Sequence, residues 1–331
     1  MNIPFWIWAA TIAGFIVVVA FDFVLVARTP HEPSFRECTL WTMLYVSLAL
    51  LFGAGILVLS GGQYAGEFYA GWLTEYSLSV DNLFVFVIIM AAFRVPRQNQ
   101  QEVLLIGIIL ALVLRGIVIA IGANALARFD ALFYVFGAFL VWTAIGLLRH
   151  DESEEFTENR VLRMVKRVLP TTNEYRGARI TVVQRGRRLF TPMLIVMVAI
   201  GTTDLLFALD SIPAVFGLTT ESYLVFTANA FALMGLRQLY FLIGGLLDRL
   251  IYLSKGLAII LGFIGVKLVL EALHHDGVSW ATEIPIAASL GFIVLTLTVT
   301  TVLSLLKSRR EGARIPPAEQ AARLQAESEP R

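Results

Sequence analysis

Two acidic pairs with the same spacing lie inside stretches that are otherwise as apolar as lipid. Glu75 and Asp81 stand six residues apart, and Asp204 and Asp210 repeat that spacing. A carboxylate in the middle of a bilayer costs several kcal/mol, roughly 2.5–3.5 on insertion scales. Four such groups in two matched segments predict a positively charged partner, and a metal cation is the first candidate.

The residue after each second aspartate adds a neutral oxygen donor. Asn82 follows Asp81, and Ser211 follows Asp210. A set of carboxylate, amide and hydroxyl oxygens favours Mg²⁺, Ca²⁺ or Mn²⁺ over Zn²⁺ or Cu⁺. We therefore predict that these four residues bind a divalent cation, as a transported substrate and not as a prosthetic group.

Glu75 and Asp204, the first acids of the two pairs, have a different predicted role. Six residues of helix separate two side chains by about 9 Å along the axis and about 120° around it. Either the helix is interrupted or the two acids of a pair do different work. Pro213 favours an interruption, because it removes the donor to the carbonyl of Leu209. We expect Glu75 toward the outer side and Asp204 toward the cytoplasmic side, as gating or proton-relay residues.

Four other charged residues also lie deep within apolar stretches, and we predict that they are charge partners in the buried ion pairs. They are Arg115, Arg237, Lys267 and Asp22. Five deep acids against three bases leave a formal balance of −2, which one divalent cation would neutralise. Protonation of a buried carboxyl is an alternative, and the bases could serve either bundle stability or the transport path.

Composition identifies the class of protein. The chain is 57% hydrophobic and 15% charged, whereas a soluble domain is about 25% charged. Nine stretches are long and apolar enough to cross a bilayer. They are 4–27, 39–59, 69–93, 103–123, 131–148, 192–217, 223–247, 256–273 and 285–306. The sequence therefore predicts an all-α polytopic membrane protein with about nine transmembrane helices.

Lys and Arg alternate between the predicted loops, and basic loops stay in the cytoplasm. Basic residues concentrate after the odd-numbered spans, above all in the 150–191 loop, whereas the loops after even-numbered spans hold only Arg128. This pattern predicts an N-terminus outside and a C-terminus in the cytoplasm.

Spans three to five and six to eight are predicted to be two inverted three-helix repeats. Each begins with the acidic spacing, and each second helix carries one arginine, Arg115 or Arg237. An odd number of spans per unit inverts the second copy, which is the architecture of many secondary transporters. Gly53, Gly55, Gly262 and Gly265 are expected at helix-packing positions. The predicted divisions are 1–68, two spans; 69–149, first repeat; 150–191, basic cytoplasmic loop; 192–273, second repeat; 274–307, final span; and 308–331, disordered tail.

Several function classes receive no support. The net charge of +1 gives no reason to expect a nucleic-acid partner, and Cys38 is the single cysteine. No nucleotide-binding loop motif is present, and nothing predicts an enzyme. In the 150–190 loop, ENRVLRMVKRVLP predicts a basic amphipathic helix that lies on the bilayer surface or binds a cytoplasmic partner.

Several motifs resemble the TerC family of integral membrane proteins over about residues 40–273. They are GWLTEYSLSVDNLFVF, FRVP, DLLFALDSIPAVF, LMGLRQLYFLIGGLLDR and FIGVK. The family is named for tellurium resistance, and its bacterial members are associated with manganese export across the cytoplasmic membrane. The resemblance implies this location in a bacterial inner membrane, and implies that Asp81, Asn82, Asp210 and Ser211 match the family's transport residues.

The chain departs from the family pattern at two positions. Gly201 stands where the family usually has a glutamate, and Gly146 where it usually has a lysine. We hypothesise that the two charges normally pair and were lost together. The departures leave open whether the ion preference is the usual one.

These observations predict a secondary transporter that exports a divalent cation, foremost Mn²⁺, by alternating access, with proton exchange as a coupling to consider. One alternative is a membrane scaffold or sensor of a tellurium- or metal-stress complex, with a structural ion site. Another is a Ca²⁺ transporter. Stoichiometry and oligomeric state are not encoded in any motif.

Overall fold

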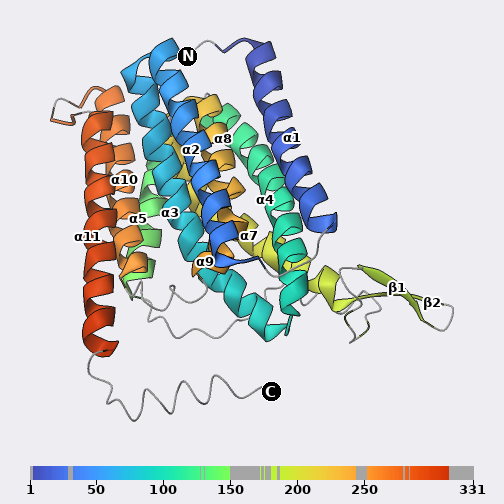
Figure 1. Cartoon of the computed structure of the whole chain (residues 1–331). Coiled ribbons are helices and arrows are strands. Elements are labelled where there is room, and N and C mark those ends of the chain that lie inside the picture. The colour runs from blue at the N-terminus through green and yellow to red at the C-terminus, as the bar shows by residue number, and fades with distance from the viewer. Residues whose placement is uncertain are drawn as a thin grey trace.

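The chain folds into a bundle of long helices, shown by a computed structural model (Figure 1). The structure describes residues 3–28, 33–126, 128–129, 131–149, 172, 175, 180–184, 187–243, 252–278, 280–282 and 284–312. The side chain of Asp81 lies outside this description. The predicted amphipathic helix at 158–170 and residues 313–331 of the predicted tail also lie outside it.

The helices follow the predicted spans closely, and several, such as those that begin at Gly62 and Arg97, start well before the predicted position. The first five are α1 (Phe5–Arg28), α2 (Phe35–Ser60), α3 (Gly62–Ala92), α4 (Arg97–Leu126) and α5 (Ala131–Arg149). The rest are α7 (Pro192–Phe216), α8 (Ser222–Met234), α9 (Leu236–Ile243), α10 (Leu253–His275) and α11 (Ile286–Gly312). Within the described residues, eight helices are long and apolar enough to cross a membrane. The prediction of an all-α polytopic membrane protein is confirmed.

Local sequence explains where several helices begin and end. The Ser34 side chain accepts a hydrogen bond from the Glu37 amide and caps α2. Gly61 joins α2 directly to α3 with φ of 98°, a conformation that glycine adopts without steric cost. Pro192 opens α7, where its missing N–H removes no helical bond.

The seventh predicted span is broken. It forms α8 and α9 with Gly235 between them, and neither piece alone reaches the roughly 30 Å of a bilayer core. Figure 1 places α8 toward the upper end of the bundle and α9 toward the lower end. The expected interruption at Pro213 is wrong, because α7 runs unbroken to Phe216. Pro213 stands one turn before that end, so no second half of the helix has to be redirected.

Contacts between the two helix triplets are reciprocal. α3 packs along α8 as α7 packs along α4, and α5 with α10 forms the most extensive helix pair. A Cβ on Gly71 would lie 3.5 Å from Ala228 in the first pair, and one on Gly107 would lie 2.8 Å from Ile200 in the second. A two-fold relation between α3–α4–α5 and α7–α8–α10 requires such matched pairs.

The helices at the two edges of the bundle expose the most apolar surface. α1 lies at one edge and α11 at the other (Figure 1). Large exposed apolar side chains include Ile16, Val17 and Phe21 on α1, and Leu295 and Val302 on α11. In a membrane these faces contact lipid, where such exposure carries no hydrophobic cost.

The basic segment between the triplets holds one element that the sequence analysis did not predict. β1 (Thr181–Gln184) and β2 (Arg187–Phe190) form an antiparallel hairpin in which Thr181 faces Phe190. The hairpin projects from the lower end of the bundle (Figure 1). The β-branched residues Thr181, Val182 and Val183 of β1 are a strand signal within a segment that is otherwise rich in charge.

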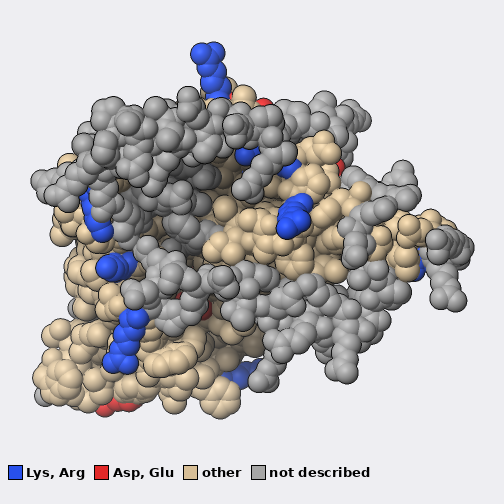
Figure 2. Space-filling view, turned by 90° about the horizontal axis from the view of Figure 1, so that it is seen from below, with Lys and Arg blue, Asp and Glu red and all other residues tan. Residues whose placement is uncertain are grey.

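Basic side chains gather at that same end of the bundle. Figure 2 shows Lys and Arg spread over its described surface, with few Asp or Glu. Helix termini here carry Arg94, Arg97, Arg149, Lys255 and Lys307. α1 begins at the opposite end, and α11 ends at this one (Figure 1).

Candidate functional site

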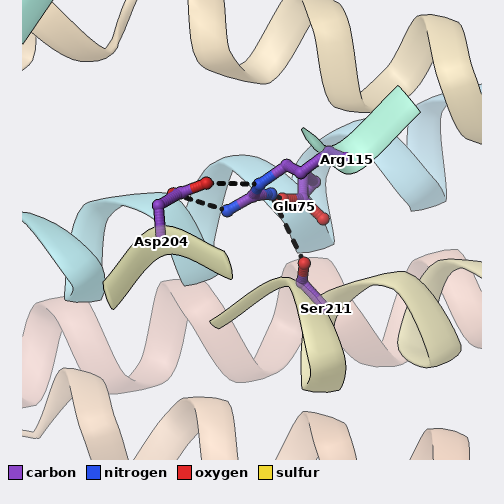
Figure 3. Close-up of polar contacts among 4 residues, drawn as sticks. All are labelled: Glu75, Arg115, Asp204 and Ser211. Atoms are coloured by element: carbon purple, nitrogen blue, oxygen red, sulfur yellow. Dashed lines mark hydrogen bonds and ion pairs between the residues drawn. The ribbon is translucent and has the colours of Figure 1, made fainter. Parts of the chain in front are cut away.

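Arg115 lies in the middle of the bundle and is bound by acids from both helix triplets (Figure 3). Its Nε and Nη2 donate to the two carboxylate oxygens of Asp204, both at 3.0 Å. Its Nη1 donates to Glu75 Oε1 and lies 3.4 Å from Ser211 Oγ. Exposure of the arginine, glutamate and aspartate is 1%, 0% and 2%, so this ion-pair cluster is fully withdrawn from solvent and lipid.

Helical geometry explains why these groups meet. Asp204 and Ser211 are seven residues apart on α7, which is two turns, so both face α4 and its Arg115. Glu75 approaches from α3, which packs beside α7. The fork of two parallel bonds to Asp204 is the strong, directional geometry that arginine makes with carboxylates.

Asp210 lies next to this cluster, not inside it. It precedes Ser211 and therefore points about 100° away around α7. It is half-buried and close enough to interact electrostatically with Arg115. Asn82 is buried in α3, and the side chain of Asp81 lies outside the described part. The metal-site role of these four residues stays a prediction.

Glu75 and Asp204 lie close together in the structure. They were predicted to lie toward opposite sides, but both bind the same guanidinium. They hold matching places in the two six-residue acidic spacings, and the helices that carry them, α3 and α7, pack together. Arg115 pairs with two of the deep acids, Glu75 and Asp204.

Arg237 has a partner elsewhere. Its Nη2 lies 2.6 Å from Oδ1 of Asp22 on α1, in a second buried ion pair. The break at Gly235 explains this difference, because Arg237 lies on α9, two residues beyond it. The first repeat therefore supplies Arg115, which binds both Glu75 and Asp204. The arginine of the second repeat, Arg237, instead binds α1 through Asp22.

Lys267 pairs with none of the deep acids whose side chains the structure describes. Its Nζ donates to the carbonyl of Gly217 at 2.8 Å and lies 3.7 Å from the half-exposed Glu271. Gly217 caps the C-terminus of α7, where the helix dipole is negative. Lys267 thus stabilises the end of the helix that carries Asp204 and Asp210.

Several buried oxygens of α3 have no hydrogen-bond partner in the described structure. They are Glu75 Oε2, Thr74 Oγ1 and Ser79 Oγ. Two carboxylates against one guanidinium also leave one formal negative charge uncompensated. Among the described side chains, no three His, Cys, Asp or Glu residues are grouped as a ready-made metal site. Two of the deep carboxylates, those of Glu75 and Asp204, are engaged with Arg115.

Glu67 is a buried acid that the sequence analysis missed. It accepts hydrogen bonds from Thr219 Oγ1 at 2.6 Å and from Gln63 Nε2 at 3.2 Å. The predicted span began at residue 69, whereas α3 begins at Gly62. Residues 62–68 include the polar Gln63 and Glu67, so they were not counted in the predicted apolar span.

The two departures from the family pattern have different surroundings. Gly201 is buried, and a Cβ there would collide with Leu110 of α4. Gly146 is exposed on α5, with no atom within 4 Å of a Cβ. Of the predicted packing glycines, Gly53 contacts the ring of Tyr69 and Gly265 contacts Gly137, as expected. A Cβ on Gly262 would make an ordinary van der Waals contact with Ala144, and a Cβ on Gly55 would meet no atom within 4 Å.

Comparisons with known proteins agree with this architecture. The sequence profile described as Integral membrane protein TerC family matches residues 60–312. An uncharacterized membrane protein of Mycobacterium tuberculosis is 45% identical over 316 residues, which cover 92% of this chain and 80% of the relative. An uncharacterized membrane protein of Myxococcus xanthus is 41% identical, over 92% and 93% of the two chains.

A third relative has a more specific name. The Escherichia coli K12 protein Alx, provisionally named a membrane-bound redox modulator, is 35% identical over 305 residues, or 88% of this chain and 92% of the relative. No solved structure matches the chain. The profile match and the relatives together place the chain in the TerC family of integral membrane proteins.

Proposed function

We propose that this protein is a secondary transporter that exports a divalent metal cation, foremost Mn²⁺, across the bacterial cytoplasmic membrane. One observation carries the proposal. The carboxylates of Glu75 on α3 and Asp204 on α7, two related helices, both bind the buried guanidinium of Arg115. Burying carboxylates is costly, and intramembrane acids usually mark an ion path.

The proposed ion ligands are Asp81, Asn82, Asp210 and Ser211. All supply oxygen, which suits Mn²⁺, Mg²⁺ and Ca²⁺. Within the described residues, buried side-chain oxygens of Thr74, Glu75 and Ser79 have no hydrogen-bond partner. They support the proposal because they lie on α3, the helix of Asp81 and Asn82, and can coordinate a cation. Glu75 and Asp204 would serve beside the ion as gating or relay groups.

Alternating access would come from movement of one helix triplet against the other. The reciprocal packing of α3 on α8 and α7 on α4 supports such a movement. The basic end of the bundle would face the cytoplasm, which puts the N-terminus outside. A redox-active pair of thiols cannot form within this chain, because Cys38 is its single cysteine.

Transport by the purified protein tests the proposal. Proteoliposomes would enclose a Mn²⁺-sensitive dye, and uptake would be compared for wild type, Asp210→Asn and Asp81→Asn. The control is Asp276→Asn, an identical chemical change at the bundle end, where Asp276 accepts from Tyr134 at 2.6 Å. We expect uptake by wild type and the control, and loss in the other two.

Competing ions and a pH gradient would define selectivity and coupling. A preference for Ca²⁺ would replace Mn²⁺ as substrate, and acceleration by an opposing proton gradient would support exchange. Absence of transport by wild type, together with ion binding that only raises thermal stability, would favour the scaffold or sensor alternative.

A further inference from the structure

We propose that Arg115 is a tethered counter-cation that occupies the transport site when no metal is bound. Its guanidinium holds the carboxylates of Glu75 and Asp204 in the empty site and releases them when a divalent cation enters. This inference rests on the proposed transport function and assigns a role that the transport proposal does not require.

The geometry places the guanidinium where it must compete with the ion. Nη1 contacts both Glu75 Oε1 and the hydroxyl of Ser211, a proposed ligand. Asp210, another proposed ligand, directly precedes Ser211 on α7. A divalent cation bound by Asp210 and Ser211 would therefore lie beside a like charge in a medium of low dielectric constant, where repulsion is strong.

The bonding of the cluster also differs from that of a permanent structural bridge. Buried ion pairs are stable only when their remaining polar atoms are satisfied, yet among the described residues the buried Glu75 Oε2 has no hydrogen-bond partner. The cluster contains two carboxylates for one guanidinium. A doubly charged ion would match that charge, whereas Arg115 matches only half of it.

The second repeat provides an internal comparison. Arg237, at the equivalent position, binds Asp22 and, among the described residues, makes no ion pair with Glu75 or Asp204. Arg237 therefore has a structural role, whereas Arg115 has a role in the site. Within the described part of the chain, Arg115 is the arginine that contacts acids from both triplets, which are the bodies that would move against each other.

A counter-cation on the protein explains how an empty transporter could return. Without a positive charge, Glu75 and Asp204 would have to reorient as buried, uncompensated anions, at a large desolvation cost. The flexible stem of Arg115 lets its charge replace the departing ion. On the return step Arg115 then compensates one of these two negative charges.

Binding of MnCl₂ to the purified protein, measured by isothermal titration calorimetry, tests the proposal. Arg115→Met should bind Mn²⁺ about 5- to 150-fold more tightly than wild type, the usual range for coupling between two competing interactions. Arg115→Met should also complete repeated transport cycles in proteoliposomes more slowly, because no guanidinium is present to displace the bound ion. Arg237→Met is the matched control and should bind Mn²⁺ as wild type does.

The outcomes separate this proposal from the transport proposal. If wild type neither binds nor transports a divalent cation, both fall. If wild type does both but Arg115→Met binds Mn²⁺ equally or more weakly, the counter-cation role is wrong and the transport function stands. If Arg115→Met does not fold, Arg115→Lys replaces it. Lysine cannot form the fork, so tighter binding is again expected, and unchanged or weaker binding would overturn the proposal.

Discussion

Gly137 of α5 and Gly265 of α10 face each other so closely that a Cβ on either would lie 2.8 Å from the carbonyl oxygen of the other. The distance is the same in both directions, as expected where two equivalent helices cross on a two-fold axis. Small residues allow this approach of two backbones, which membrane helices use in place of a hydrophobic driving force.

We predict that Gly137→Ala and Gly265→Ala each destabilise the protein by about 1–3 kcal/mol, the usual cost of overpacking. The added methyl would meet backbone, which cannot turn away as a side chain can. Gly146→Ala and Gly262→Ala, on the same two helices, are the controls, since a Cβ fits at both positions. Thermal unfolding in detergent measures the effect, and equal melting temperatures for all four variants would contradict it.

The two acids that share Arg115 should differ in their contribution to stability. Asp204→Asn breaks the fork and turns an amide N–H toward the guanidinium, which should cost about 1.5–3 kcal/mol. Glu75→Gln leaves the fork to Asp204 intact and removes the excess negative charge, so it should cost less. Chemical unfolding of the two variants would show the order, and a larger loss for Glu75→Gln would refute this account of the cluster.

The Asp22–Arg237 pair should show strong coupling in a double-mutant cycle. Removing either partner alone leaves a buried charge, which costs about 3–5 kcal/mol. Asp22→Asn with Arg237→Met removes both charges and should recover much of that loss. The free energies of unfolding of the four proteins give the coupling, and additive single effects would mean that the pair does not hold α1 to α9.

Lys267→Met should loosen the end of α7. It removes the bond to the Gly217 carbonyl and the positive charge at the helix C-terminus, at a combined cost of about 1–3 kcal/mol. Lys255→Met, at an exposed position on the same helix, should change stability by less than about 0.5 kcal/mol. Matching melting temperatures for the two variants would exclude a capping role for Lys267.

The hypothesis that charges at positions 201 and 146 pair can be tested by restoring them. Gly201→Glu must displace Leu110 and bury a carboxylate, so we expect clear destabilisation, whereas Gly146→Lys has room and should have little effect. If the charges pair, adding Gly146→Lys should recover part of the stability lost in Gly201→Glu. Equal expression and melting of the single and double variants would reject the pairing.

Much of the fold follows from the sequence because its causes are local. Long apolar runs predict helices wherever backbone groups must be satisfied without water, and eight of the nine predicted stretches form single helices. The matched acids predicted equivalent helices α3 and α7. The ends of the helices were harder to predict from the sequence. α3 and α4 continue beyond their apolar cores into polar residues such as Glu67 and Asn99.

The sequence alone determined that buried acids and bases had to find partners in the membrane, because an unpaired charge there is too costly. Only the tertiary structure decided which charges meet. Glu75 and Asp204 share Arg115, while Arg237 turns to Asp22 after the break at Gly235. Partner choice depends on the depth and rotation of whole helices, and these are set by contacts such as Gly137–Gly265 between segments far apart in the chain. A linear pattern records the charges and their spacing, but not the packing that brings them together.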